Sequence, residues 1–164
     1  MEIFISNIKD ISHMFRLNGI THILSVISRD ELDFIKLPKE FDRNNWLLLY
    51  MDDMIDINSP LAPTKNQIET ILKWGKTLPS NANVLVHCFA GISRSTACAL
   101  ALKVQEIGIA HINECSKWLV NQRPNACPNP VITWHADELL SANGILFKHS
   151  EDIANARIAA SLKA

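Results

Sequence analysis

The sequence lacks a long apolar run, a large excess of charge and a paired cysteine motif. No stretch reaches the about 18 apolar residues that cross a membrane, and the apolar run in residues 1–6 is too short, with an early Glu2, for a signal peptide. We therefore expect a cytosolic protein that does not contact membranes. The net charge of −1 at pH 7 provides no basic stripe, which argues against a nucleic-acid partner.

Cysteine is also scarce, and its four positions show no Cys-x-x-Cys spacing. This pattern predicts neither a disulfide framework nor a metal site, and nothing in it calls for a cofactor. We expect Cys98 to be a core residue, whereas spacing assigns no role to Cys115 or Cys127. Because 164 residues with 48% hydrophobic side chains can bury a substantial core, one domain is expected.

Apolar periodicity predicts strands that alternate with helices. A helix at residues 65–78, capped by Thr64, separates apolar strands at 46–51 and 84–86, which is the crossover of a parallel sheet. We predict an α/β fold with a central, mostly parallel sheet of four or five strands and helices on both faces. The other expected strands are 2–5 and 20–27, the other expected helices are 7–17, 112–121 and 150–163, one helix begins at Asn129, and residues 28–45 form a surface connection.

The most informative stretch runs from Val84 to Ser95, where an apolar strand ends at Cys88 and a helix begins near Arg94. The loop between them curls around a helix N-terminus, where free amide N–H groups and the helix dipole favour an anion such as phosphate. Gly91 allows a tight turn, and the planar guanidinium of Arg94 can hold two phosphate oxygens. The predicted phosphate-binding residues are Phe89, Ala90, Gly91, Ile92, Ser93 and Arg94.

The same electrostatic field acts on the sulfur atom of Cys88. A helix N-terminus and a guanidinium stabilise the thiolate, so we predict a nucleophile at neutral pH. We expect His87 to hold the loop backbone, and Ser95 to stabilise the thiolate as it leaves a phospho-cysteine intermediate. A cysteine in an apolar strand is usually inert, but the string His-Cys-x-x-Gly-x-x-Arg-Ser at a strand-to-helix junction favours catalysis.

An acidic segment follows the strand at 46–51 and offers a proton donor for the leaving group. Leu47, Leu49 and Met51 share one face of the strand, and a period of two places Asp53 on that face. We therefore predict Asp53 as the general acid. Asp52 and Asp56 stay open as alternatives.

Residues His87 to Ser95 resemble the signature of the cysteine-dependent protein tyrosine phosphatases, and the run from Ala90 to Ser95 is similar to the compact dual-specificity branch. Residues 19–26 resemble the early strand of that family, and Arg123-Pro124 with Pro128-Asn129 resembles its late motif. The acidic loop is similar to that of small bacterial members. The general acid of the family looks similarly placed to Asp53, although the 35 positions from Asp53 to Cys88 are slightly more than the family usually has.

The resemblance implies a phosphatase catalytic domain at residues 1–144, with 145–164 as its C-terminal helical extension. It also implies metal-independent hydrolysis of phosphotyrosine in proteins, or of phosphoserine and phosphothreonine if the pocket is shallow. The loop carries no lysine, which argues against polyphosphoinositides. Two alternatives stay open: an RNA 5′-triphosphatase on the same scaffold and a phospho-binding module without activity. We expect a monomer, with weak self-association through the last helix as the other possibility.

Overall fold

The computed structural model describes residues 1–163, and at its centre lies a sheet of four parallel strands. The strands are β1 (Glu2–Ser6), β2 (His22–Ile27), β3 (Trp46–Tyr50) and β4 (Asn83–His87), in the order β1-β4-β2-β3. Strands β2 and β4 are interior, and almost all of their residues are buried, as their apolar sequences predict. The predicted α/β fold with a parallel sheet is confirmed.

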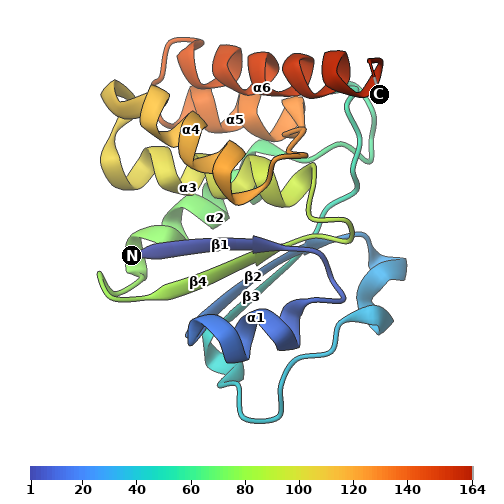
Figure 1. The fold of residues 1–164 in the computed structure, drawn as a ribbon, viewed down its shortest axis with the longest axis vertical. Helices are drawn as coiled ribbons and strands as arrows, with labels where there is room; N and C mark the ends of the chain where they lie inside the picture. The colour runs from blue at the N-terminus through green and yellow to red at the C-terminus, as the bar shows by residue number, and fades with distance from the viewer. Residues whose placement is uncertain (164) are drawn as a thin grey trace.

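Helices cover both faces of this sheet (Figure 1). Helix α1 (Ile11–Asn18) packs on one face, and the other face carries α2 (Lys65–Thr77), α3 (Arg94–Ile107), α4 (Ile112–Gln122), α5 (Pro130–Leu139) and α6 (Ile145–Ser161). Three short 3-10 helices lie in the connections: η1 (Arg29–Phe34), η2 (Arg43–Asn45) and η3 (Ile109–His111). The larger apolar core fills the space between the sheet and the α2–α6 layer, and a smaller core lies under α1.

Helix α3 occupies the middle of the thick layer and is buried over most of its length. It contacts the sheet and also α2, α4 and α5. The alanines at positions 97, 99 and 101 are buried, so neighbouring elements pack closely against α3. This packing fixes the N-terminus of α3 beside the C-terminal end of β4. The loop between these two elements is therefore held rigidly at both ends.

Most helix boundaries agree with the expected caps, but α1 begins later than predicted. Thr64 and Gln67 form the capping box of α2, and Gly19 ends α1 with a φ of 57°. The expected helix at 7–17 begins only at Ile11, because the side chain of Asn7 accepts hydrogen bonds from the backbone N–H groups of Lys9 and Asp10. That local turn replaces the first helical turn.

The C-terminal helix also begins at a different residue than predicted. It begins at Ile145 instead of residue 150, because the buried carboxylate of Asp137 accepts hydrogen bonds from the N–H groups of Gly144 (2.7 Å) and Phe147 (3.1 Å). The apolar side chains of this helix are only partly covered, since Ile158 is 51% exposed.

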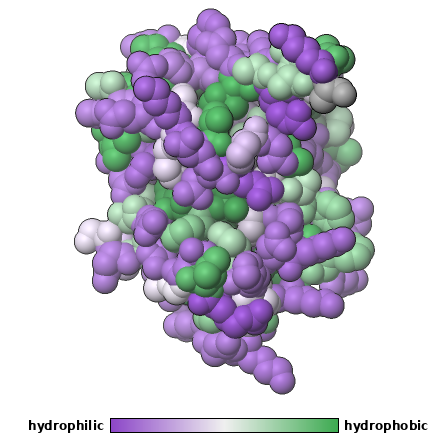
Figure 2. Space-filling model, viewed as in Figure 1, coloured by the Kyte–Doolittle hydropathy of each residue, from purple (hydrophilic) through white to green (hydrophobic). Residues whose placement is uncertain are grey.

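In the view of Figure 2 hydrophilic residues dominate, and the hydrophobic ones form isolated patches between them. Within residues 1–163 no helix is long and apolar enough to cross a bilayer.

Asp137 provides a test of how α6 is attached to the rest of the chain. Asp137→Asn should lower the free energy of unfolding by about 1–3 kcal/mol, because one of two charge-assisted hydrogen bonds to the start of α6 is lost. Urea unfolding of the variant beside Glu138→Gln, an exposed neighbour, measures the effect. Equal midpoints for the two variants would contradict this account of the cap.

Candidate active site

The loop from Cys88 to Ser93 turns all of its carbonyl oxygens away from its centre. Each carbonyl accepts a hydrogen bond from a group outside the ring of the loop; the donors, in loop order, are His87 Nδ1, Ile8 N, the guanidinium of Arg123 for both Ala90 and Gly91, Cys127 N, and Asn129 N. In a trans peptide the C=O and N–H groups point in opposite directions. The N–H groups of residues 89–94 therefore point into the hollow, where they can bind an anion.

Gly91 is required by the close approach of β1 beneath the loop. Its φ is +71°, and a Cβ atom at this position would lie 2.7 Å from the backbone of Ser6 and of Asn7. Both the backbone conformation and the lack of space therefore exclude a side chain. The first strand of the chain thus shapes the loop from below.

The thiol of Cys88 lies at the bottom of this hollow and is 1% exposed. Its Sγ atom accepts a hydrogen bond from the N–H group of Gly91 at 3.2 Å and lies 3.2 Å from Oγ of Ser95. These donors stabilise a thiolate more than they stabilise a neutral thiol. The hydroxyl of Ser95 is thus within hydrogen-bond distance of the sulfur.

His87 belongs to a chain of hydrogen bonds that crosses three strands. The indole N–H of Trp46 can only donate, and it donates to Oγ of Ser25 at 2.8 Å. The carbonyl of Cys88 can only accept, so Nδ1 of His87 carries the proton and donates to it at 3.3 Å; Nε2 of the neutral ring then accepts from the hydroxyl of Ser25 at 2.5 Å. His87 is thus a neutral positioning residue, and burial lowers its pKa to about 4.

Arg94 is 4% exposed, and its guanidinium is held by the segment that follows β2. Nη1 and Nη2 donate to the two carboxylate oxygens of Glu31 at 2.9 and 3.1 Å, and Nη1 also donates to the carbonyl of Met51 and to Oγ of Ser28. Burial opposes the charge, but the hydrogen bonds and charge of Glu31 outweigh it and raise the pKa of Arg94 above its usual range.

One edge of the Arg94 guanidinium is free. Nε has no hydrogen-bond partner although it is buried, and Glu31 takes one of the two N–H groups of Nη2. The remaining Nη2–H lies on the same edge as the Nε–H, so together they form a bidentate hydrogen-bond donor. Oδ2 of Asp53 lies 3.9 Å from Nε on this edge.

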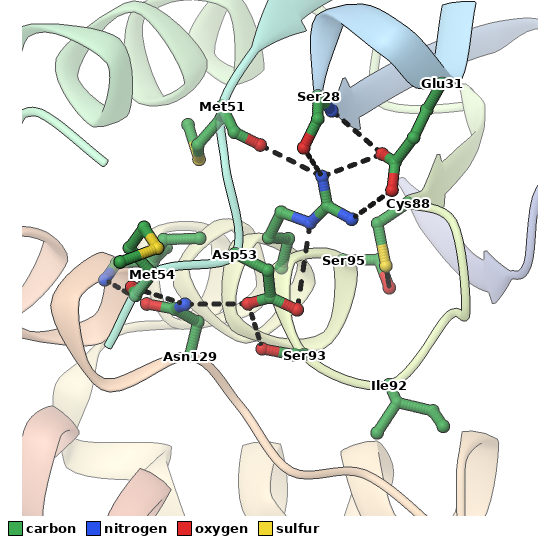
Figure 3. A network of polar contacts seen from close by, with 12 residues as sticks. Ser28, Glu31, Met51, Asp53, Met54, Cys88, Ile92, Ser93, Ser95 and Asn129 are labelled. Atoms are coloured by element: carbon green, nitrogen blue, oxygen red, sulfur yellow. Dashed lines mark hydrogen bonds and ion pairs between the residues drawn. The ribbon is translucent and has the colours of Figure 1, made fainter. Parts of the chain in front are cut away.

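Among the described residues, Asp53 is the one acidic candidate of the three whose carboxylate contacts the loop. Its Oδ1 accepts hydrogen bonds from Oγ of Ser93 (2.6 Å) and from Nδ2 of Asn129 (2.8 Å), as Figure 3 shows. Asp56 instead accepts from Asn58 within its own turn, and Asp52 lines a separate cavity beside β3.

The sequence did not reveal the roles of Glu31, Asn129 and Arg123. The expectation that residues 28–45 form only a surface connection was wrong, because this segment supplies Glu31. A capping pattern, Ser28-x-x-Glu31, was a visible signal, and it does place the carboxylate at the start of η1. Asn129 caps α5 with its side-chain oxygen while its nitrogen holds Asp53.

The other three cysteines stand apart from this arrangement. All are free thiols; Cys98 and Cys115 are buried, and burial raises the pKa of both. In the described part of the chain no cluster of three or more His, Cys, Asp or Glu side chains is placed to hold a metal ion.

Comparison with known proteins points in one direction. The family model described as dual specificity phosphatase, catalytic domain, matches residues 3–135. Dual specificity protein phosphatase 15 of Mus musculus is 30% identical over 127 residues, which cover 77% of this chain and 48% of the relative. Dual specificity protein phosphatase 16 of Homo sapiens is 27% identical over 123 residues, or 71% of this chain and 16% of the relative. The chain thus spans half or less of the length of these relatives.

Solved structures share the fold. The human tyrosine phosphatase-like serine/threonine/tyrosine-interacting protein superposes with a TM-score of 0.66 at 22% identity, over 86% of this chain and 92% of that one. DUSP15 superposes with a TM-score of 0.57 at 26% identity, over 92% of this chain and 90% of that one.

The low pKa of His87 predicts how stability depends on pH. Between about pH 6.5 and pH 4 the unfolded chain binds a proton at this residue that the folded chain does not, so stability falls as pH falls through this window. The loss should approach about 3 kcal/mol. Urea unfolding at several pH values should show a smaller loss for His87→Gln and an unchanged loss for the exposed-site control His111→Gln. A variant of His87 with the wild-type pH dependence would contradict the assignment.

Proposed function

The chain belongs to the dual specificity phosphatase catalytic domain family, and on this premise we propose that it is a metal-independent phosphomonoester hydrolase that acts on phosphoproteins through a phospho-cysteine intermediate. One observation carries the proposal. The inward N–H groups of residues 89–94, the thiol of Cys88 and the free edge of Arg94 converge on one hollow. That hollow has the donors a phosphoryl group needs, with a nucleophile at its base.

In the first step the Cys88 thiolate attacks phosphorus, and the sulfur–phosphorus bond forms as the bond to the leaving oxygen breaks. The amide N–H groups and the free edge of Arg94 stabilise the equatorial oxygens. Asp53 gives its proton to the leaving oxygen. Because Ser93 and Asn129 occupy Oδ1, the proton sits on Oδ2, the oxygen nearer to Arg94.

In the second step water replaces the departed alcohol or phenol. Asp53, now a carboxylate, accepts a proton from this water, and the oxygen attacks phosphorus as the sulfur–phosphorus bond breaks. The hydroxyl of Ser95 and the N–H of Gly91 stabilise the thiolate as it leaves. Inorganic phosphate is released and the thiolate is restored. At each step, groups of this chain stabilise the negative charge on the phosphoryl oxygens and on the leaving thiolate.

Phosphotyrosine is the substrate that the surroundings of the loop favour. Phe89 is 40% exposed and Phe34, from η1, is 57% exposed. Their rings meet edge to face with centroids 5.9 Å apart, beside the loop and on the segment that carries Glu31. An exposed aromatic pair at this place offers apolar contact to a phenyl ring. The lack of lysine in residues 88–94 gives no support for a polyphosphoinositide.

We also propose that residues 1–144 form the catalytic domain and that 145–164 extend it. The carboxylate of Asp137 holds the start of α6, and Oγ of the buried Ser150 donates to Oγ1 of Thr133 in α5 at 2.8 Å. These contacts support an extension that packs on the same domain.

Hydrolysis of p-nitrophenyl phosphate in the presence of EDTA tests the proposal. Wild type should be active, and Cys88→Ser should lose at least about 1,000-fold of kcat because a serine hydroxyl is a much weaker nucleophile than a thiolate. Asp53→Asn should lose about 100- to 10,000-fold on phenyl phosphate, whose leaving group needs protonation, while Asp56→Asn stays close to wild type. A folded wild type without turnover would favour the phospho-binding module, and a requirement for metal would contradict the proposed chemistry.

Glu31 provides a second test, because it orients Arg94 without reaching the substrate hollow. Glu31→Gln should lower kcat/KM by about 100-fold and weaken inhibition by inorganic phosphate, since a loosened guanidinium no longer presents its free edge. Asp30→Asn is the matched control and should change neither quantity. If Glu31→Gln keeps the inhibition constant of wild type, Glu31 does not position Arg94.

A further inference from the structure

An apolar groove lies beside the proposed general acid. It has a volume of about 370 Å³ and is lined by Ile55, Asp56, Ile57, Pro130, Val131, Trp134 and Phe147. Its apolar walls are exposed: Ile55 is 72%, Ile57 49% and Trp134 44% accessible. Exposed large apolar side chains gathered in one concave place mark an interaction site more often than scattered ones do.

The groove is built on a rigid frame. The rings of Trp134 and Phe147 meet edge to face with centroids 5.3 Å apart, and they come from α5 and α6. The opposite wall belongs to the segment between β3 and α2, which in Figure 1 rises from the edge of the sheet toward the layer of α5 and α6. Nδ2 of Asn129 donates to the carbonyl of Met54 at 3.0 Å and thereby ties the two walls together.

This frame is continuous with the proposed catalytic site. Ile55 stands two positions after Asp53, and Pro130 follows Asn129, the residue that holds Asp53. An extended chain advances about 3.3 Å per residue. The groove therefore begins within about two residues of the carboxylate that receives the substrate's leaving oxygen.

The geometry of the reaction at phosphorus indicates which part of the substrate lies over the groove. Attack and departure at phosphorus occur roughly in line, so the leaving oxygen lies on the side opposite Cys88. Asp53 protonates that oxygen, and the substrate's polypeptide is attached to it. The polypeptide, attached to that oxygen through the phenyl ring of a phosphotyrosine, can then continue past Asp53, over Met54 and Ile55 on one side and Asn129 and Pro130 on the other.

We infer that this groove binds an apolar side chain of the phosphoprotein substrate, located two to four residues from the phosphorylated residue. The inference rests on the proposed function and names a sequence preference for it. The volume lies at the low end of the about 300–1,000 Å³ typical of ligand pockets, which suits one or two side chains. A second copy of the chain would need about 800 Å² per partner in a stable interface, and a groove of this size does not supply it. Asp56 on the rim also disfavours an acidic side chain.

Peptide kinetics tests this inference. The probes are phosphotyrosine peptides of serine and glycine in which a single leucine is moved from four residues before to four residues after the phosphotyrosine. Wild type should show a kcat/KM about tenfold higher for leucine at one or two positions on one side. Ile55→Ser and Trp134→Ala should each remove this preference and leave the turnover of p-nitrophenyl phosphate within about twofold of wild type.

The control is Ile158→Ser, which removes an exposed isoleucine from α6 away from the groove and should keep the leucine preference. Thermal unfolding of each variant separates a lost contact from a lost fold, and Ile55, at 72% exposure, is the variant expected to unfold like wild type. A preference retained by both groove variants, or equal rates for all peptides, would overturn the inference. So would groove variants that abolish self-association in sedimentation without changing peptide kinetics.

Binding of the same peptides to Cys88→Ser separates the groove from the chemistry. If wild type hydrolyses no phosphate ester but Cys88→Ser still binds the leucine peptides more tightly, and Ile55→Ser in that background does not, the proposed enzyme fails and the groove stands. If wild type is active but Cys88→Ser binds all peptides equally, the groove fails and the enzyme stands.

Discussion

The site depends on the outward orientation of six consecutive carbonyl groups, those of residues 88–93, each of which is hydrogen-bonded to a group outside the ring of the loop. The donors come from the end of β4, from the segment between β1 and α1 and from the segment between α4 and α5, so distant parts of the domain set the shape of the loop. Six N–H groups face inward as a consequence, and together they favour an anion. Gly91 is the one position where β1 leaves no room for a side chain.

Glu31 has two opposite effects on Arg94: it offsets the positive charge, and it orients the guanidinium. The carboxylate of Glu31 lowers the net charge of the hollow, but it fixes the guanidinium so that one edge stays free for a ligand. Asp53 sits 3.9 Å from that edge and is held by Ser93 and Asn129. The proposed nucleophile, the guanidinium and the proposed proton donor thus come from the residue after β4, from the start of α3 and from the segment after β3. Rigid packing of α3 keeps these three groups in fixed positions relative to one another.

Local signals in the sequence predicted much of this arrangement. The capping box at Thr64, the stop at Gly19 and the apolar strands fixed the order of elements, and the string from His87 to Ser95 located the loop. Glu31 could not be found in this way, because its partner Arg94 lies 63 residues away and only the fold brings the two together. The late start of α1 was missed for a local reason, since Asn7 forms a turn that competes with the helix.

The central claim is that the sulfur of Cys88 bonds to phosphorus during turnover. The most direct measurement mixes the enzyme rapidly with p-nitrophenyl phosphate, quenches with acid and determines the mass of the intact protein and of its peptides. The account predicts one phosphoryl group on the peptide that contains Cys88, formed within the first turnover and absent from Cys88→Ser. A first-turnover burst of p-nitrophenol with no phosphorylated protein, or with phosphate on another residue, would contradict it.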